Sequence, residues 1–279
     1  MKELKLKPKN LTDLSLEAEV ITPDSVVGKT IKEVRSLPVY IGNTIQMLED
    51  YFYVNGKTAE ISSDQLISIQ GECENVKYIG YGMTAGHIIV EGSVGMHVGA
   101  KMEGGKLIVT GSASNWAGAE MKGGLLKIHK DAGHQLGAAY RGGTKGITGG
   151  IIVVGGGVGL EAGAFMRRGM LVIQGNAAPF LGVHMNGGEI FVFGRVAKRV
   201  GAGAKGNGGF IACFGGVDSL LPTYVYDTTF RPDFMKLYLR QLRDQFGIKS
   251  AGKYLDTSFR RYRGDNAVGG NGEILITET

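Results

Sequence analysis

Glycine recurs in this sequence with a period of 19 residues, and this repeat limits the possible folds more than any other feature. Two series of three glycines keep the spacing: Gly86, Gly105 and Gly124, then Gly150, Gly169 and Gly188. Further glycines follow most of these positions at the seventh and fourteenth residue of each unit. A repeat of this length is typical of proteins built from stacked units, each of which packs only against its neighbours.

Each repeat begins with a short stretch in which apolar residues alternate along the chain. The alternating pairs are Ile88/Val90, Leu107/Val109, Leu126/Ile128, Ile152/Val154, Leu171/Ile173 and Ile190/Val192. A third apolar position holds Met83, Met102, Met121, Tyr140, Met166 and Met185. Alternation places the paired side chains on one face of a strand. The sequence therefore predicts a mainly β chain that folds as a right-handed parallel β-helix of glycine-rich coils, with these residues in a continuous core.

Composition agrees with a folded chain and narrows its class. Glycine makes up 47 of the 279 residues, roughly 17% against an average of about 7%. No strict every-third-residue glycine is present, which excludes collagen, and the central repeats exclude a helix bundle. The formal net charge of +5 suits an acidic ligand or partner without requiring nucleic acid. Cys73 and Cys213 have no metal-type spacing, and no signal peptide or membrane span is evident, so we expect a cytoplasmic protein without membrane partners.

Four segments follow from where the repeat begins and ends. We predict a small α+β cap over residues 1–62, the parallel β-helix over 63–221, a helical flap over 222–263 and a closing coil over 264–279. In the cap, Asp24 or Ser25 is a candidate N-cap for a helix. The flap holds an amphipathic helix, whose predicted apolar stripe is Phe234, Leu237, Tyr238, Leu242 and Phe246. A seven-residue insertion near residues 142–150 predicts a loop that projects from one corner.

Later coils have apolar residues at positions that alternation turns outward. The candidates for a partner interface on this face are Val153, Val172, Phe191, Phe193, Phe210 and Phe214. An apolar outer face of this length is expected to be covered. Two interpretations remain open: the chain's own flap lies on it, or a stable protein partner does.

Basic residues follow the methionine position in three consecutive repeats. They are Lys122, Arg141 and Arg167, with Arg168 adjacent. Stacked like charges repel by about 1 kcal/mol or less per pair in water. Either this is a solvated corner, or it is a contact for carboxylates on a partner or on a polyanionic ligand.

No catalytic constellation is visible in the sequence. The five histidines, His87, His97, His129, His134 and His184, occur without an HxH or HExxH spacing, and no CxxC is present. The phosphate-loop pattern GxxxxGK[ST] is absent, and the acidic residues are scattered over different repeat positions. We therefore expect no catalytic residue and no metal site in this chain, which favours a scaffold over a free-standing β-helix enzyme.

The repeat unit is similar to the glycine-rich β-helix at the C-terminus of the glutamate synthase large subunit. It resembles more closely the C subunit of formylmethanofuran dehydrogenase, including the bacterial counterpart in the formyltransferase/hydrolase complex. The segments that resemble this family are TPDSVVGKTIKEVRSLPVYIGN, GMTAGHIIVEG, NWAGAEMKGG and YRGGTKGITGG. LLPTY and the tail FRRYRGDNAVGGNGEILI resemble the bacterial members in particular.

The resemblance implies a non-catalytic scaffold subunit in one-carbon metabolism. Its implied partners are the amidohydrolase-like (A) subunit, and formyltransferase or molybdopterin-type subunits. The complex implies a methanofuran-type carrier, and zinc, tungsten or molybdenum in other subunits, with no cofactor in this chain. The carrier's glutamate-rich tail is one candidate ligand for Lys122, Arg141, Arg167 and Arg168. The alternative is a glutamate-synthase-type β-helix spacer of an amidotransferase complex, and the sequence does not separate the dehydrogenase from the hydrolase version.

Overall fold

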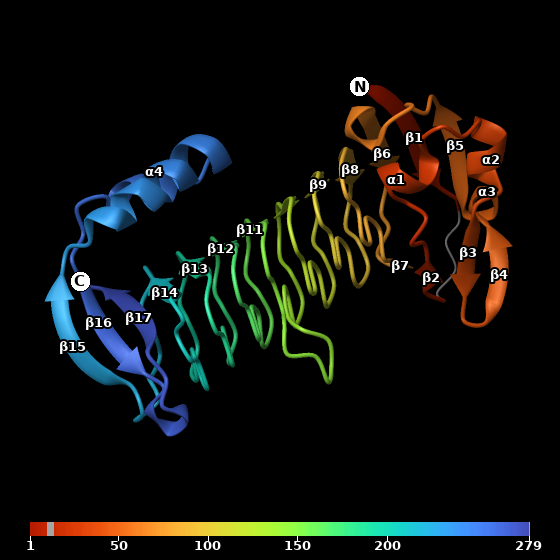
Figure 1. Cartoon of the computed structure of the whole chain (residues 1–279). Helices are drawn as coiled ribbons and strands as arrows, with labels where there is room; N and C mark the ends of the chain where they lie inside the picture. Colours follow the sequence, from red (N-terminus) through yellow and green to blue (C-terminus); the bar gives the residue numbers. More distant parts are fainter. Residues whose placement is uncertain (10–13, 279) are drawn as a thin grey trace.

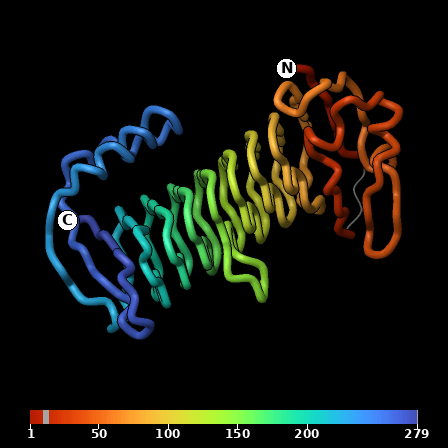
Figure 2. The backbone as a smooth tube through the Cα atoms, in the orientation of Figure 1, coloured from red at the N-terminus to blue at the C-terminus, as the bar shows by residue number. Residues whose placement is uncertain are grey.

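The computed structural model describes residues 1–9 and 14–278 and is mainly β. Within these residues, thirteen strands form one large sheet and four form a second sheet (Figure 1). The helices are few, and the longest is α4 (Asp233–Phe246). The large sheet runs through an elongated stack, with an N-terminal body at one end and the β15–β17 strands at the other (Figure 2).

The repeats supply the central strands of the large sheet. These strands are β6 (Gln65–Gln70), β8 (His87–Glu91), β9 (Lys106–Val109), β10 (Leu125–Ile128), β11 (Ile151–Val154), β12 (Met170–Ile173), β13 (Glu189–Val192) and β14 (Phe210–Cys213). Each is parallel to the next, with equivalent repeat positions paired. Leu126, for example, pairs with Leu107 on one side and Ile152 on the other.

A second line of parallel pairing follows each strand. Single residues pair from coil to coil in the order Cys73, Val94, Ala113, Ala132, Val158, Ala177, Val196 and Val217. Each repeat therefore contacts its neighbour at two separate places. Side-chain oxygens satisfy backbone groups beside this line: Asn115 Oδ1 accepts from His134 N at 2.7 Å, and Asn176 Oδ1 accepts from Arg195 N at 2.8 Å.

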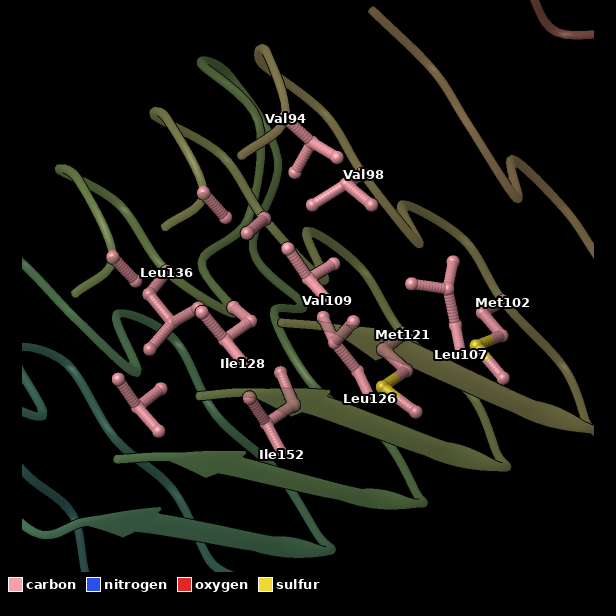
Figure 3. Packing of buried hydrophobic residues seen from close by; sticks show 14 of the residues in the cluster. Val94, Val98, Met102, Leu107, Val109, Met121, Leu126, Ile128, Leu136 and Ile152 are labelled. Atoms are coloured by element: carbon pink, nitrogen blue, oxygen red, sulfur yellow. The ribbon is translucent and has the colours of Figure 1, made fainter. Parts of the chain in front are cut away.

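The alternating aliphatic residues form the core, as predicted. Val109, Ile128 and Val154 are fully buried, and equivalent side chains from successive coils lie in rows (Figure 3). Met102 and Met121 lie beside Leu107 and Leu126 in the same view. Because one coil alone cannot bury these groups, apolar surface leaves water only when the coils stack.

One predicted core position is wrong. The period assigns Tyr140 to the methionine position, but Ile147 occupies it and is fully buried, while Tyr140 lies outside the core. The backbone shows the substitution directly, because Arg167 N donates to Ile147 O at 2.8 Å just as Asn186 N donates to Met166 O at 2.8 Å. The seven inserted residues therefore enter before the inward position, and their loop projects from the stack in Figures 1 and 2.

The N-terminal segment adds strands to the first coil. β1 (Lys2–Pro8) is parallel to β6 and antiparallel to β5 (Phe52–Gly56). The second sheet consists of β4 (Thr44–Met47), β3 (Pro38–Ile41), β2 (Leu16–Glu17) and β7 (Val76–Lys77). Three short helices accompany them: α1 (Pro23–Val26), α2 (Ile31–Arg35) and α3 (Leu48–Tyr51).

The predicted N-cap of the first segment is wrong. Two short helices form there, and Thr22 caps α1 while Thr30 caps α2 through a capping box with Glu33. Asp24 instead links this segment to the first coil, since its carboxylate accepts from Thr84 N at 2.9 Å and from Ser62 Oγ at 3.0 Å. These hydrogen bonds lower the pKa of Asp24 despite the opposing effect of burial.

The segment before the chain's end contains strands as well as the predicted helix. β15 (Val225–Phe230) pairs antiparallel with β16 (Phe259–Gly264), which pairs antiparallel with β17 (Gly272–Thr277). β17 is parallel to β14, as expected of a closing rung. This segment also contains two short 3-10 helices, Lys249–Tyr254 and Asn266–Val268, and a third lies before β6 at Ser62–Asp64.

Helix α4 covers the outward apolar face of the later coils. Val153, Val172, Phe191, Phe210 and Phe214 are at most 8% exposed and pack in one cluster with the buried side of the helix. Phe193 is partly buried and stacks on Phe214, with 4.6 Å between ring centroids. The chain's own segment therefore covers this face, as in the first of the two interpretations. The structure thus corrects the prediction of a partner interface at the five buried positions, whereas Phe193 stays partly exposed.

The apolar stripe predicted for α4 is also only partly correct. The residues that face the strands are Met235, Leu239 and Leu242, whereas Phe234 is 40% and Leu237 is 69% exposed. Two overlapping apolar stripes fit a helical period here, and packing against β12–β14 selects the narrower one.

Because neighbouring coils approach closely at some glycines, we expect the stability of the fold to be sensitive to substitution there. Gly124 has φ +80°, and a Cβ there would lie 2.7 Å from Gly104 O of the preceding coil. Gly142, in the inserted loop, has φ +84° with no atom within 4 Å of its ideal Cβ. Both alanine variants lose about 1–2 kcal/mol through the left-handed backbone. In urea unfolding we expect Gly124→Ala to lose about 2 kcal/mol more stability than Gly142→Ala, because the added Cβ pushes neighbouring coils apart only at Gly124. Equal losses of stability in the two variants would contradict this.

Because α4 covers the strands with one side only, we expect its buried and exposed leucines to respond differently to substitution. Leu239→Ala removes a fully buried side chain and is expected to cost about 2–5 kcal/mol locally. The matched variant Leu237→Ala, at a 69% exposed position, should change stability by no more than about 0.5 kcal/mol. Binding of a hydrophobic dye and hydrogen exchange of α4 measure the effect. Increased dye binding in both variants, or in neither, is the result that would count against the assignment.

Candidate functional site

A groove lies beside the inserted loop. Its volume is about 570 Å³, and its lining comes from four consecutive coils and from the loop. Five rings form its walls: Trp116, Tyr140, Phe165, Phe180 and His184. The small side chains of Ala138, Ala139, Ala164 and Val183 also line it, and Arg141 lies at its loop side. We call this cavity the aromatic groove.

Four of these rings stand on left-handed backbone at the corners of the coils. The φ values are +63° for Trp116, +58° for Phe165, +68° for Phe180 and +54° for His184. Bulky residues seldom adopt this region. Polar residues at equivalent corners, among them Gln135 and Glu161, have the same conformation, so the coil geometry requires it. The corner keeps these side chains out of the core, where all four are partly or largely exposed.

A line of stacked rings continues from the groove towards the first coils. His97 stacks on Tyr78 with 4.5 Å between ring centroids, and Trp116 lies 5.1 Å from Tyr140 in the same measure. Tyr140 Oη lies 2.9 Å from His97 Nδ1, within hydrogen-bond distance. Glu120 Oε1 accepts from Tyr140 N at 3.2 Å. These contacts hold Tyr140 outside the core, at the start of the inserted loop.

The surroundings of these stacked rings shift the pKa values of His97 and Tyr140. Burial, and to a smaller extent the positive charge of Lys77, lower the pKa of His97 to about 4. Burial raises the pKa of Tyr140 above its usual range. Both side chains are therefore neutral at pH 7, which permits a hydrogen bond between them.

The predicted series of basic residues does not form a continuous row. Thr148, and not Arg141, follows the inward position of the coil between Lys122 and Arg167, because Thr148 N donates to Met121 O at 2.8 Å. Lys122 Nζ pairs with Glu103 Oε1 at 2.7 Å. The Arg167 guanidinium donates to Thr144 O of the loop at 2.8 Å. Arg141 lies within the loop itself, at the aromatic groove.

Positive charge remains unpaired on the loop side of the groove. Arg141 and Arg168 are exposed and make no hydrogen bond or ion pair with any residue that the structure describes. A second cavity of about 280 Å³ shares Phe165 and His184 with the aromatic groove and is lined by Arg167 and Lys205. The two cavities therefore adjoin, and both present cationic side chains.

The aromatic groove was not found by sequence reasoning, although a signal for it exists. Its rings occupy two corner positions of the 19-residue unit, Trp116 and Phe180 at one, Phe165 and His184 at the other. These positions flank the insertion on both sides. A search for rings at non-core repeat positions next to the seven-residue insertion would have located the site.

Other features bear on what the described residues can do. No cluster of three or more His, Cys, Asp or Glu side chains suited to a metal occurs in residues 1–9 and 14–278. Over the same residues, no helix combines the length and apolarity needed to cross a membrane. The arrangement at the groove, which combines rings, small floor residues and guanidinium groups, is suited to binding.

Comparison with known proteins gives a match over nearly the whole chain. No family model matches the sequence. A chain in the crystal structure of the formyltransferase/hydrolase complex (FhcABCD) from Methylorubrum extorquens, with methylofuran bound, superposes with a TM-score of 0.89 at 30% identity. The match covers 99% of this chain and 100% of that chain.

Shorter matches connect the chain to archaeal proteins. It is 44% identical over 98 residues to the C subunit of molybdenum-containing formylmethanofuran dehydrogenase 1 of Methanosarcina barkeri. It is 43% identical over 98 residues to the C subunit of tungsten-containing formylmethanofuran dehydrogenase 2 of Methanothermobacter marburgensis. Each alignment covers 35% of this chain, and 33% and 36% of the relative. The matched part thus spans about a third of the length of these curated relatives.

The stacked parallel strands and the glycine repeat place the chain in a class of glycine-repeat β proteins. The matched relatives of this class are subunits of larger complexes. The full-length match narrows this class further. The chain belongs to the family of the formylmethanofuran dehydrogenase C subunit, which also includes a chain of the formyltransferase/hydrolase complex.

The lowered pKa of His97 predicts a pH-dependent stability. Below about pH 6.5 the unfolded chain binds a proton at this ring, which the folded chain does not bind until about pH 4. Stability is therefore expected to decrease as the pH falls from about 6.5 to 4. His97→Asn tolerates the φ of +65° and should flatten the urea midpoint over this range. The matched variant His184→Asn should retain the wild-type dependence, because His97 is still present; a flattened curve in both would refute the assignment.

Proposed function

We propose that this chain is a non-catalytic scaffold, the C subunit of a complex of the formylmethanofuran dehydrogenase or formyltransferase/hydrolase type in one-carbon metabolism. In this role it holds an amidohydrolase-like subunit together with formyltransferase or molybdopterin-type subunits. The observation that supports this most strongly is the match over 99% of the chain to a component of a complex named with four subunits. A cytoplasmic location agrees with this proposal.

The form of the stack supports a mechanical role. We infer that its coils make a right-handed parallel β-helix, since parallel strands joined by crossovers are right-handed in about 98% of cases. In this scheme residues 63–221 are the β-helix, 1–62 its cap, 222–263 the flap and 264–279 the closing coil. The antiparallel strands β5 and β16 end the parallel pairing at either side, which limits further stacking of coils.

A scaffold must offer fixed lateral surfaces, and the chain has two. One is the outer side of α4, and the other is the corner with the inserted loop and the aromatic groove. Backbone pairing at two places in each coil holds both surfaces on one continuous body. Partners bound at separate coils would therefore keep a fixed distance from one another.

The carrier and metals of the complex belong, in this proposal, to the other subunits. A methanofuran-type carrier would pass between them, with zinc, and tungsten or molybdenum in the dehydrogenase version, outside this chain. The basic residues Lys122, Arg141, Arg167 and Arg168 are proposed as a contact for carboxylates. Of these, Lys122 is already paired with Glu103, so Arg141 and Arg168 are the most available.

The glutamate-synthase-type spacer is the weaker candidate. No feature of the described residues favours it, and the full-length structural match is to the formyltransferase/hydrolase complex.

Purification of the native assembly through a tag on this chain tests the proposal. We expect the chain to elute with an amidohydrolase-like subunit in a fixed ratio, and to have no formyl-transfer or formyl-hydrolysis activity when isolated. Metal analysis then separates the versions, since tungsten or molybdenum indicates the dehydrogenase and its absence from an active complex indicates the hydrolase. Elution of the chain alone, or catalysis by the isolated chain, would overturn the scaffold role.

A further inference from the structure

We propose that the aromatic groove binds an acidic peptide segment of another subunit. In this arrangement one bulky apolar side chain of the segment enters between the rings, and carboxylates near it meet Arg141 and Arg167. The inference rests on the proposed function, because it assumes that the chain works inside a complex of several subunits. It goes further by naming the surface and the chemistry of what binds there.

The composition of the groove favours an apolar anchor. Its walls are rings and its lining includes Ala138, Ala139 and Val183, so the space between the rings is open and mostly apolar. The volume of about 570 Å³ accommodates a bulky side chain with part of its backbone. Trp, Tyr and Arg are the residue types that contribute most to binding at protein interfaces, and Trp116, Tyr140 and Arg141 meet at this site.

The charge around the groove favours carboxylates beside that anchor. Of the two acidic groups nearby, Glu120 lies 4.0 Å from Lys101 Nζ, which offsets its charge, and Glu161 lines the groove with Oε2 accepting from Gln135 Nε2 at 3.3 Å. Among the described residues, Arg141 has no hydrogen-bond or ion-pair partner, and the Arg167 guanidinium hydrogen-bonds only the carbonyl of Thr144. Guanidinium groups bind carboxylates through charge-assisted hydrogen bonds, which set the orientation of a docked chain.

The groove is held in shape before anything binds. The inserted loop is fixed at both ends, because Tyr140 N donates to Glu120 Oε1 of the preceding coil at 3.2 Å and Gly146 N donates to Phe165 O of the next coil at 2.9 Å. The Arg167 guanidinium fastens the loop's centre through Thr144 O. A preformed site loses little entropy when a partner docks, which favours affinity from a short segment.

A free polycarboxylate fits these observations less well. It would satisfy Arg141 and Arg167, but it has no apolar side chain to occupy the space between Trp116, Phe165 and Phe180. Only a chain with both kinds of side chain uses the rings and the guanidinium groups together. The chemistry of the groove therefore favours a protein segment over a carrier tail.

Variants in the purified complex test the charge requirement. Arg141→Glu reverses the unpaired charge at the groove and is expected to weaken association of the chain with its partner subunits about tenfold or more. Lys130→Glu is the matched control, an equally exposed charge reversal on the same repeat, outside the groove. Val183→Phe, which fills the floor at a partly exposed position, should weaken association without changing charge. Circular dichroism and the urea midpoint verify that each variant folds.

A photoreactive benzoylphenylalanine in place of Lys145, an exposed residue of the inserted loop beside the groove, identifies the occupant within the assembled complex. We expect mass spectrometry to find a crosslinked peptide from another subunit, with at least two Asp or Glu residues near the attachment point. A second measurement uses Trp116, the single tryptophan of the chain, as a fluorescence reporter in the isolated protein. Poly-L-glutamate should neither shift its emission nor compete with the partner subunits for binding.

The outcomes separate this inference from the proposed function. If the wild-type chain assembles with no other subunit, the scaffold proposal itself fails. If it assembles, but Arg141→Glu and Val183→Phe associate like Lys130→Glu, only the groove inference is overturned. It is also overturned if poly-L-glutamate binds at Trp116 and displaces a subunit, or if the crosslinked species is not an acidic peptide.

Discussion

The structure depends on how closely the backbones of successive coils approach at glycine. A Cβ at Gly124 would lie 2.7 Å from Gly104 O, and one at Gly111 would lie 2.5 Å from Gly92 C. A side chain at either of these two glycines would collide with the preceding coil unless the backbone shifted. Because the separation is fixed, the strands pair in register and each inward side chain meets its equivalent in the next coil. The glycine repeat and the aliphatic repeat therefore have the same cause, which is the in-register stacking of equal coils, and both have a period of 19 residues.

A core formed in this way leaves function to the outside of the coils. The inward positions are fully committed to packing, as the burial of Val109 and Ile128 shows. Variation is tolerated at the corners, where backbone geometry is set by the stack and side chains reach solvent. The insertion near residues 142–150 uses this freedom, and it forms one wall of the aromatic groove. The break in the period thus helps to form this cavity.

The sequence predicts the repeated part of the fold because the period leaves little choice there. It fails where the period breaks. Counting 19 residues from Met121 reaches Tyr140, but the insertion precedes the inward position, which Ile147 therefore fills. The same shift moves Arg141 out of the basic row and into the loop. On α4, two apolar stripes satisfy a helical period, and only contact with the strands determines that Leu239 faces inward while Leu237 does not. The groove was missed because its rings occupy corner positions that the core pattern does not mark, on consecutive coils on both sides of the insertion.

The chain covers the apolar residues on one side of its stack and leaves rings exposed on another side. Apolar strand positions such as Phe191 are covered by α4, so the surface that would otherwise aggregate is satisfied within the molecule. The inserted loop lies at the opposite edge of the stack from α4 in Figures 1 and 2. There the rings are only partly buried, and Arg141 has no partner among the described residues. Covering the strand face with α4 removes an apolar surface that would otherwise aggregate, whereas exposed rings beside an unpaired charge favour the binding of a specific partner. The asymmetry explains how a stacked repeat can avoid aggregation and still bind a partner at the groove.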